Sequence, residues 1–207
     1  MGSGSSEYQK KEILDRWKHL KDGDRSALDW LFRYFYQELY DYANRLIDDK
    51  ELVRDSIQDL FLSLWIKRER LVIPDSVKAY LLVSLRNLIY DQLKDRRKKD
   101  NRNKIIEAEL FERTFEVQDV HFKEDVTEEL KQQLIIALNQ LNNKQRETLF
   151  LRYYNGLSNK EIAEVIGINH QSVKNNISRA IINLRGIVKT LGLSTLIVIL
   201  RSMEVTG

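Results

Sequence analysis

The chain has 207 residues, 43% of them hydrophobic, which suffices for one large or two small domains with ordinary cores. Its net charge of +3 is ordinary, whereas the absence of cysteine excludes disulfides, thiolate zinc sites and cysteine nucleophiles. Three scattered histidines predict no metal site, and one proline with eight glycines favours an all-α protein, because strands and their turns need more punctuation.

Two helices are predicted in the first part of the chain. Apolar residues recur at three- and four-residue intervals from Leu28 to Ile47 and again over Glu51–Lys67, a pattern typical of helices with one buried face. The outward side of the second helix is polar and carries Arg54, Asp55, Gln58 and Asp59. We interpret Lys67–Asp75 as an exposed loop, since it is charged and contains a proline, and the residue before a proline avoids helical angles.

A third, long helix begins near Ser76 and ends in a basic run. Between Lys94 and Lys104 there are seven bases and two acids, a net charge of +5. Such a run is either a solvated helix end or a nucleic-acid surface. Tyr80 and Asn87 precede it on the same helix, and aromatic or amide groups beside bases are what single-stranded nucleic acid contacts.

The charge reverses in the middle of the chain. Between Ile105 and Glu129 there are nine acids and two bases, a net charge of −7. Apolar residues are sparse there, so we interpret residues 100–125 as a linker. Its acids serve either solvation or mimicry of nucleic acid.

A second helical module opens at Val126. Its first helix is predicted from apolar residues at helical spacing up to Leu141. Asn143 is predicted to cap the next helix, whose inward apolar residues are Leu149, Phe150 and Tyr153.

The stretch Leu157–Arg185 has the pattern of a helix-turn-helix. Ser158 and Glu161 form an S-x-x-E capping box, Gly167 supplies the turn, and Asn169 can cap the second helix. From Asn169 to Lys189 there are four bases and no acid. The outer side carries His170, Gln171, Ser172, Lys174, Asn175, Ser178 and Arg179. We therefore predict a helix that reads the major groove of DNA; the alternative is a helical hairpin with a solvated polar face.

Three segments, in this order, resemble the extracytoplasmic-function group of bacterial RNA polymerase sigma factors. DSIQDLFLSLW is similar to the region 2.2 helix of the group, YLLVSLRNLIYDQLKDRRKK to the region that follows, and the stretch from Asn143 to Arg185 to region 4. The resemblance covers about Leu28–Lys189. It implies an all-α fold with a region 2-like domain at 7–99, the linker at 100–125, a region 4-like helix-turn-helix domain at 126–190, and an apolar extension at 191–207.

The resemblance also implies a function and a role for each surface. The chain would be a transcription initiation factor without catalytic activity or cofactor, which binds core RNA polymerase and promoter DNA. Polymerase would be bound by Asp55, Gln58, Asp59 and Leu62. The opened −10 strand would be held by Lys78, Tyr80, Asn87, Lys94, Arg96 and Arg97. The −35 duplex would be read by the outer residues of the recognition helix together with Asn169.

Other expectations concern partners and alternatives. Each module should expose apolar surface that polymerase covers, around Leu60–Trp65 and around Leu149–Tyr153, and an anti-sigma factor is an expected partner. For Asn87 an internal hydrogen bond is the alternative to a DNA contact. The apolar extension either packs on the second module or docks on an inhibitor or membrane protein.

Two other function classes remain open. An autonomous helix-turn-helix regulator would explain the second module alone, and a pure interaction protein would explain the acidic linker and the apolar extension. No paired carboxylates, phosphate loop or nucleophile–base pair indicate an enzyme. No apolar run reaches the roughly 18 residues of a spanning helix, so we expect a cytoplasmic protein without stable membrane insertion.

Overall fold

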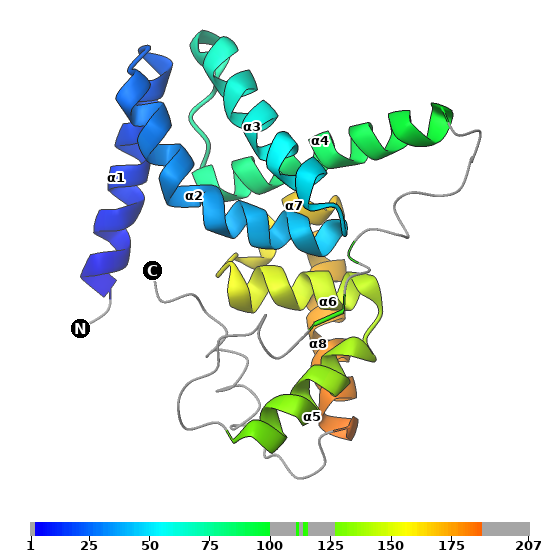
Figure 1. The fold of residues 1–207 in the computed structure, drawn as a ribbon. Coiled ribbons are helices and arrows are strands. Elements are labelled where there is room, and N and C mark those ends of the chain that lie inside the picture. The colour runs from blue at the N-terminus through cyan, green and yellow to red at the C-terminus, as the bar shows by residue number, and fades with distance from the viewer. Residues whose placement is uncertain (1–2, 100–110, 112–113, 116–126, 188–207) are drawn as a thin grey trace. The chain divides into compact units, whose positions relative to one another are not determined.

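The computed structural model describes residues 3–99, 111, 114–115 and 127–187, and of these the side chains of 7–95, 111, 114–115, 127–129 and 131–184. Every regular element among them is a helix, which confirms the predicted all-α class (Figure 1). The chain divides into two compact units, Met1–Ile106 and Glu107–Gly207.

The described part of the first unit contains four α-helices, α1 (Ser3–Lys21), α2 (Arg25–Leu46), α3 (Lys50–Ile66) and α4 (Val77–Lys99), and a short 3-10 helix at Arg68–Arg70. The central helix is α2, which contacts the other three (Figure 1). Its buried face includes Leu31, Phe35 and Leu39, spaced four residues apart as one helical stripe requires. Asp24 and Asp49 cap α2 and α3 by accepting hydrogen bonds from backbone N–H groups of the first turns.

Helix α1 precedes the first helix that the sequence predicted. Trp17 and Leu20, which have no exposed surface, anchor it in the unit. The Trp17 ring meets Tyr80 of α4 edge-on, with ring centroids 5.1 Å apart. Eight of its nineteen residues are charged, but Ile13, Leu14, Trp17 and Leu20 recur at the spacing of one helix face, a short signal that the sequence prediction missed.

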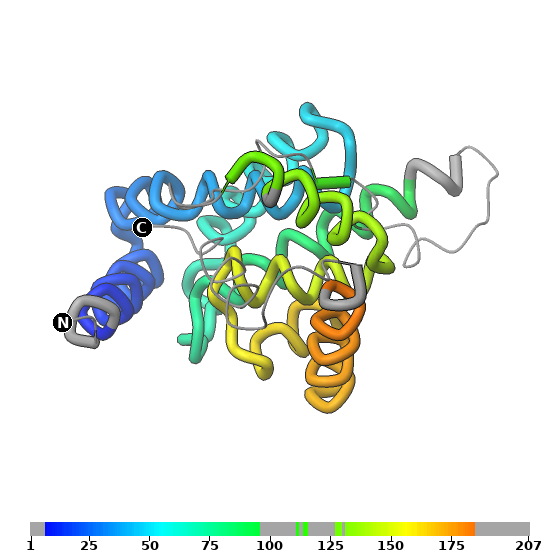
Figure 2. The backbone as a smooth tube through the Cα atoms, turned by 90° about the horizontal axis from the view of Figure 1, so that it is seen from below, coloured from blue at the N-terminus to red at the C-terminus, as the bar shows by residue number. Residues whose placement is uncertain are grey.

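The second unit contains α5 (Glu128–Asn139), α6 (Asn143–Leu149), a π-helix (Phe150–Tyr154), α7 (Asn159–Ile166) and α8 (His170–Ile187). The central helix is α8, which contacts α5, α6 and α7. Val173, Ala180 and Leu184 of α8 are fully buried. Figure 2 shows α8 in orange, following α7 after a tight turn.

Two details of the predicted second module are wrong. Asn142, not Asn143, caps α6, and it forms a capping box with Gln145. Tyr154, not Tyr153, is buried, and its ring stacks on Phe150 with centroids 4.5 Å apart. The π-helix explains the second difference, because its wider turn places the residue four positions on in line with Phe150.

Two phenylalanines of the predicted linker belong to the core of the second unit. Phe111 and Phe115 are 0% and 3% exposed, and their rings lie 5.7 and 6.2 Å from that of Phe150. The Asn139 side chain accepts a hydrogen bond from the Phe115 backbone N–H (2.8 Å) and donates one to its carbonyl (2.9 Å). The Arg146 guanidinium donates to the Phe111 carbonyl at 3.3 Å. These five residues are called the connector clip below.

The clip also corrects an expectation about exposed surface. The prediction of an exposed apolar surface around Leu149–Tyr153 is wrong, because Leu149, Phe150 and Leu151 are at most 3% exposed. The rest of the predicted linker and the apolar extension at 191–207 lie outside the described residues, so the proposed domain boundaries stay predictions.

Candidate nucleic-acid interface

Local signals fix the hairpin of α7 and α8. The Ser158 hydroxyl accepts from the Glu161 backbone N–H at 3.3 Å, and the Ser158 N–H donates to the Glu161 carboxylate at 2.7 Å. Gly167 ends α7 with φ of +73°, where a side chain would be strained, and its N–H donates to the Ala163 carbonyl. Asn169 then caps α8 by accepting from the Ser172 N–H at 2.7 Å. The predicted capping box, turn and cap are all confirmed.

The outer face of α8 is polar and accessible. Six of the seven predicted outer residues are exposed, and Ser172 is half-buried, as is expected beside the capped first turn. The Gln171 amide donates to the Asn175 carbonyl oxygen at 3.2 Å, so these two amides lie together one turn apart. Side-chain amides contact the edges of DNA bases, and the basic side chains of lysine and arginine contact base edges and phosphates. The geometry is therefore that of a helix-turn-helix reader.

The predicted residues of α4 fall into two groups. Lys78 forms an ion pair with Glu38 of α2 at 2.7 Å, and Tyr80 packs on Trp17, so both hold the unit together. Asn87 and Lys94 are exposed, and seven residues, about two helical turns, separate them on one face. Arg96 and Arg97 lie on α4, but their side chains are outside the described set.

The loop before α4 is held by α1, a support that sequence reasoning missed. The Trp17 indole N–H donates to the Val72 carbonyl at 2.9 Å, and the Lys21 ammonium donates to that of Leu71. Val72 and Ile73 themselves are exposed. Because its backbone is fixed while its side chains project, this loop can present groups to a bound strand.

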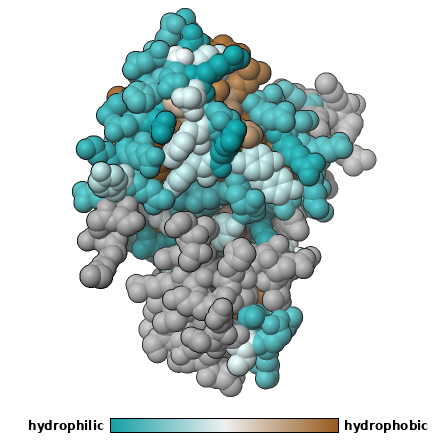
Figure 3. All heavy atoms as spheres, turned by 60° about the vertical axis from the view of Figure 1, so that its left-hand side comes forward, coloured by the Kyte–Doolittle hydropathy of each residue, from teal (hydrophilic) through white to brown (hydrophobic). Residues whose placement is uncertain are grey.

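The predicted polymerase residues form one stripe on α3. Asp55, Gln58, Asp59 and Leu62 are exposed and recur at the three- and four-residue spacing of one helix face. Leu62 is 56% exposed and Ile66, one turn on, is 67% exposed. Of the apolar surface predicted around Leu60–Trp65, only Leu62 is exposed, since Leu60, Phe61 and Leu64 are buried and Trp65 is half-buried. Figure 3 shows an apolar area interrupting the hydrophilic surface of the first unit.

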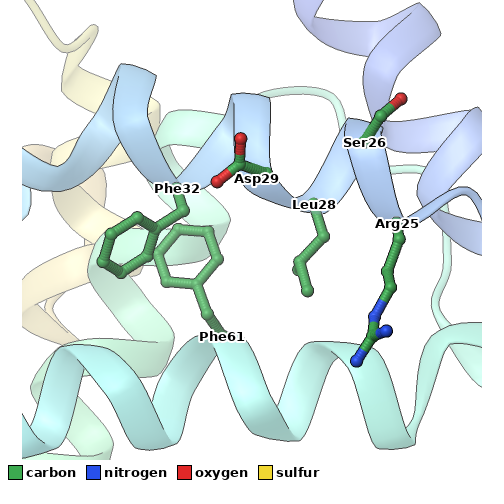
Figure 4. A pocket seen from close by; sticks show the side chains of 6 residues that line it. All are labelled: Arg25, Ser26, Leu28, Asp29, Phe32 and Phe61. Atoms are coloured by element: carbon green, nitrogen blue, oxygen red, sulfur yellow. The ribbon is translucent and has the colours of Figure 1, made fainter.

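A cavity of about 460 Å³ lies beside α2 and α3 (Figure 4). Phe32 and Phe61 close one end with rings in edge-to-face contact at 5.1 Å, and Leu28 and Arg25 project toward α3. None of the predicted site residues lines it. Within the described residues, no group of side chains could hold a metal ion, and no helix is long and apolar enough to cross a membrane.

Comparison with known proteins bears on this arrangement. Residues 31–99 match the family described as sigma-70 region 2, and residues 131–184 match sigma-70 region 4. The chain is 25% identical over 149 residues to the RNA polymerase sigma factor SigZ of Bacillus subtilis, covering 72% of this chain and 80% of that protein. It is 29% identical over 180 residues to the ECF RNA polymerase sigma factor SigL of Mycobacterium tuberculosis, covering 83% and 97%.

Two solved structures share the fold. The sigma factor RpoE of Bartonella quintana, in complex with the anti-sigma factor NepR, has a TM-score of 0.52 at 23% identity over 78% of this chain and 96% of that one. CnrH, in complex with the cytosolic domain of CnrY, has a TM-score of 0.55 at 19% identity over 86% and 98%.

Proposed function

The chain belongs to the sigma-70 family, in its extracytoplasmic-function group, and on this premise we propose which surface performs each step of promoter recognition. The protein is a transcription initiation factor that binds core RNA polymerase and directs it to specific promoters. One family region falls in each compact unit. The division of labour between the units follows from their exposed surfaces.

The exposed face of α8 is assigned to the −35 duplex. The observation that carries this assignment is a helix-turn-helix whose outer face has bases and amides but no acid. The first turns of such a helix contact the edges of DNA bases, and this is the reason for proposing Gln171 and Asn175 as the base-contacting residues. Lys174 and Arg179 supply charge for phosphates or for a guanine edge.

The first unit is assigned to the −10 strand and to polymerase. Exposed Asn87 and Lys94, followed by the basic end of α4, suit a single strand. Lys78 and Tyr80 support that surface from within through Glu38 and Trp17. The Asp55–Leu62 stripe on α3 is assigned to polymerase, because an exposed apolar residue among acids and an amide is typical of a protein contact.

An anti-sigma factor is the proposed inhibitory partner. Two of the solved structures that share the fold are complexes, one with an anti-sigma factor and one with a cytosolic domain. The proposed place of action is the cytoplasm, where core polymerase works. No catalytic role is assigned to any residue.

Run-off transcription tests the function. Core RNA polymerase from the native host and a promoter library with randomised −35 and −10 elements should give transcripts only when this chain is added. Asn175→Ala should change the −35 preference, whereas Asn183→Ala, an exposed residue further along α8, should not. Specific duplex binding and repression without polymerase would instead establish an autonomous helix-turn-helix regulator.

A further inference from the structure

The connector clip takes no part in the surfaces assigned above. It joins the chain after α4 to the second unit at Phe111, which lies sixteen residues before Thr127, the residue that precedes α5. The Asn139 amide holds the Phe115 backbone in both directions, at 2.8 and 2.9 Å. An amide that pairs with both backbone groups of one residue fixes the position of the chain as well as its proximity.

Burial and backbone geometry indicate a specific anchor. Arg146, which holds the Phe111 carbonyl, is itself 6% exposed and donates to Asn143 at 2.7 Å. Phe111 has φ of +67°, a left-handed conformation that a bulky residue rarely adopts. Such a conformation persists only when its surroundings determine it. Here the surroundings are the rings of Phe115 and Phe150, the Arg146 hydrogen bond to Phe111, and the Asn139 hydrogen bonds to Phe115.

The clip shortens the reach between the units. From Lys99, the last residue of α4, to Phe111 there are twelve residue steps, and a fully extended chain then spans at most about 40–43 Å. If the second unit began only at α5, the twenty-eight steps from Lys99 to Thr127 would allow about 92–101 Å. A closed clip thus removes more than half of the available reach. One base pair of B-DNA adds about 3.4 Å along the helix axis, so a change in reach can be expressed as a change in spacer length.

We propose that the connector clip is a determinant of promoter specificity, because it limits the spacer length between the −10 and −35 elements that the chain accepts. The inference rests on the proposed function, in which each unit binds one element. Two linked binding modules cooperate only while the linker spans their sites, and a linker that falls short loses the second contact. A chain with a closed clip should therefore fail sharply on long spacers.

Insertions on the two sides of the clip separate this idea from a general effect of linker length. Six Gly and Ser residues are inserted either between Ile106 and Glu107, before the clip, or between Val120 and His121, after it. The first insertion adds about 20 Å of reach, equivalent to about six base pairs. The second adds none while the clip is closed. Full-length chains and core polymerase then transcribe promoters whose spacers are lengthened by one to four base pairs.

The insertion before the clip should raise transcription from the lengthened promoters at least fivefold relative to the unaltered chain. The insertion after the clip should leave the spacer profile unchanged until it is combined with Asn139→Ala, which removes both hydrogen bonds to Phe115. Circular dichroism checks that each variant is folded.

If both insertions broadened the range of accepted spacer lengths equally, the proposal that the clip anchors the chain would be overturned. No broadening by either would mean that polymerase contacts alone set the spacing, which also overturns the proposal. Failure of the unaltered chain to direct transcription from any promoter would overturn the proposed function itself, and that control is scored before any spacer is compared.

Discussion

Replacing the two clip phenylalanines tests whether they are core residues of the second unit. Phe111 and Phe115 are 0% and 3% exposed, and truncating a buried phenylalanine to alanine costs about 3–5 kcal/mol. The two sites should then respond oppositely to glycine. At Phe111, with φ of +67°, Phe111→Gly should be about 1 kcal/mol more stable than Phe111→Ala, because alanine is strained there. At Phe115, Phe115→Gly should be about 0.5–1 kcal/mol less stable than Phe115→Ala.

Urea denaturation of the full chain measures these differences, and the tryptophans supply an internal control. All three, Trp17, Trp30 and Trp65, lie in the first unit, so their fluorescence reports that unit alone, while circular dichroism reports both. The second-unit transition should fall by roughly 2–3 M urea for each alanine variant, taking an m-value of about 1.5 kcal/mol/M. The fluorescence transition should not move. A shift no larger than that of Ile136→Ala, whose side chain is 55% exposed, would refute the reasoning.

Three further predictions concern the DNA face, the polymerase stripe and a helix cap. Lys174→Ala should weaken binding to all promoters alike and lower the slope of log K against log salt by about one. Arg179→Ala should cost about 1–3 kcal/mol of binding free energy and relax the preference at one position of the −35 element. Holoenzyme titrations on promoter variants measure both effects. Leu62→Ala should weaken polymerase binding roughly tenfold or more, since burying a leucine contributes about 1.5–3 kcal/mol, and Lys50→Ala on the same helix should have no effect in the same binding assay. Hydrogen bonds from Ser26 hold the pKa of Asp24 below its usual 3.8. The carboxylate therefore contributes its full stability above pH 3.8, and this contribution is lost as the pH falls through the lowered pKa. Asp24→Asn should lack this acid-dependent loss of stability in a pH series of thermal unfolding.

Short-range signals explain why the helix-turn-helix could be predicted. A capping box, a glycine turn and a cap each depend on residues within four positions of one another, and Ser158, Gly167 and Asn169 behave as their types require. The same holds for α3, whose exposed and buried residues alternate with helical period. Local chemistry was sufficient in these segments.

Long-range contacts explain what could not be predicted. Asn139 meets Phe115 across 24 residues, and Trp17 meets the carbonyl of Val72 across 55. Neither contact leaves a periodic pattern in the sequence from which it could be predicted. Acids surround Phe111 and Phe115 in the sequence, and composition there indicated a linker. Two buried aromatic side chains outweigh that composition, because each removes a large apolar area from water.

The charge on α8 explains why the linkage between the units matters. Among its described side chains, the exposed bases of α8 are Lys174 and Arg179. Even if both contacted phosphates, they would give a salt slope of only about −1.8, whereas proteins that hold DNA by charge alone make many more. Base contacts by amides discriminate between sequences but do not supply that missing attraction. We therefore expect the second unit to rely on the first unit and on polymerase to remain on the duplex. Its occupancy then depends on the effective concentration that the tether provides, and a clip that shortens the tether acts directly on that quantity.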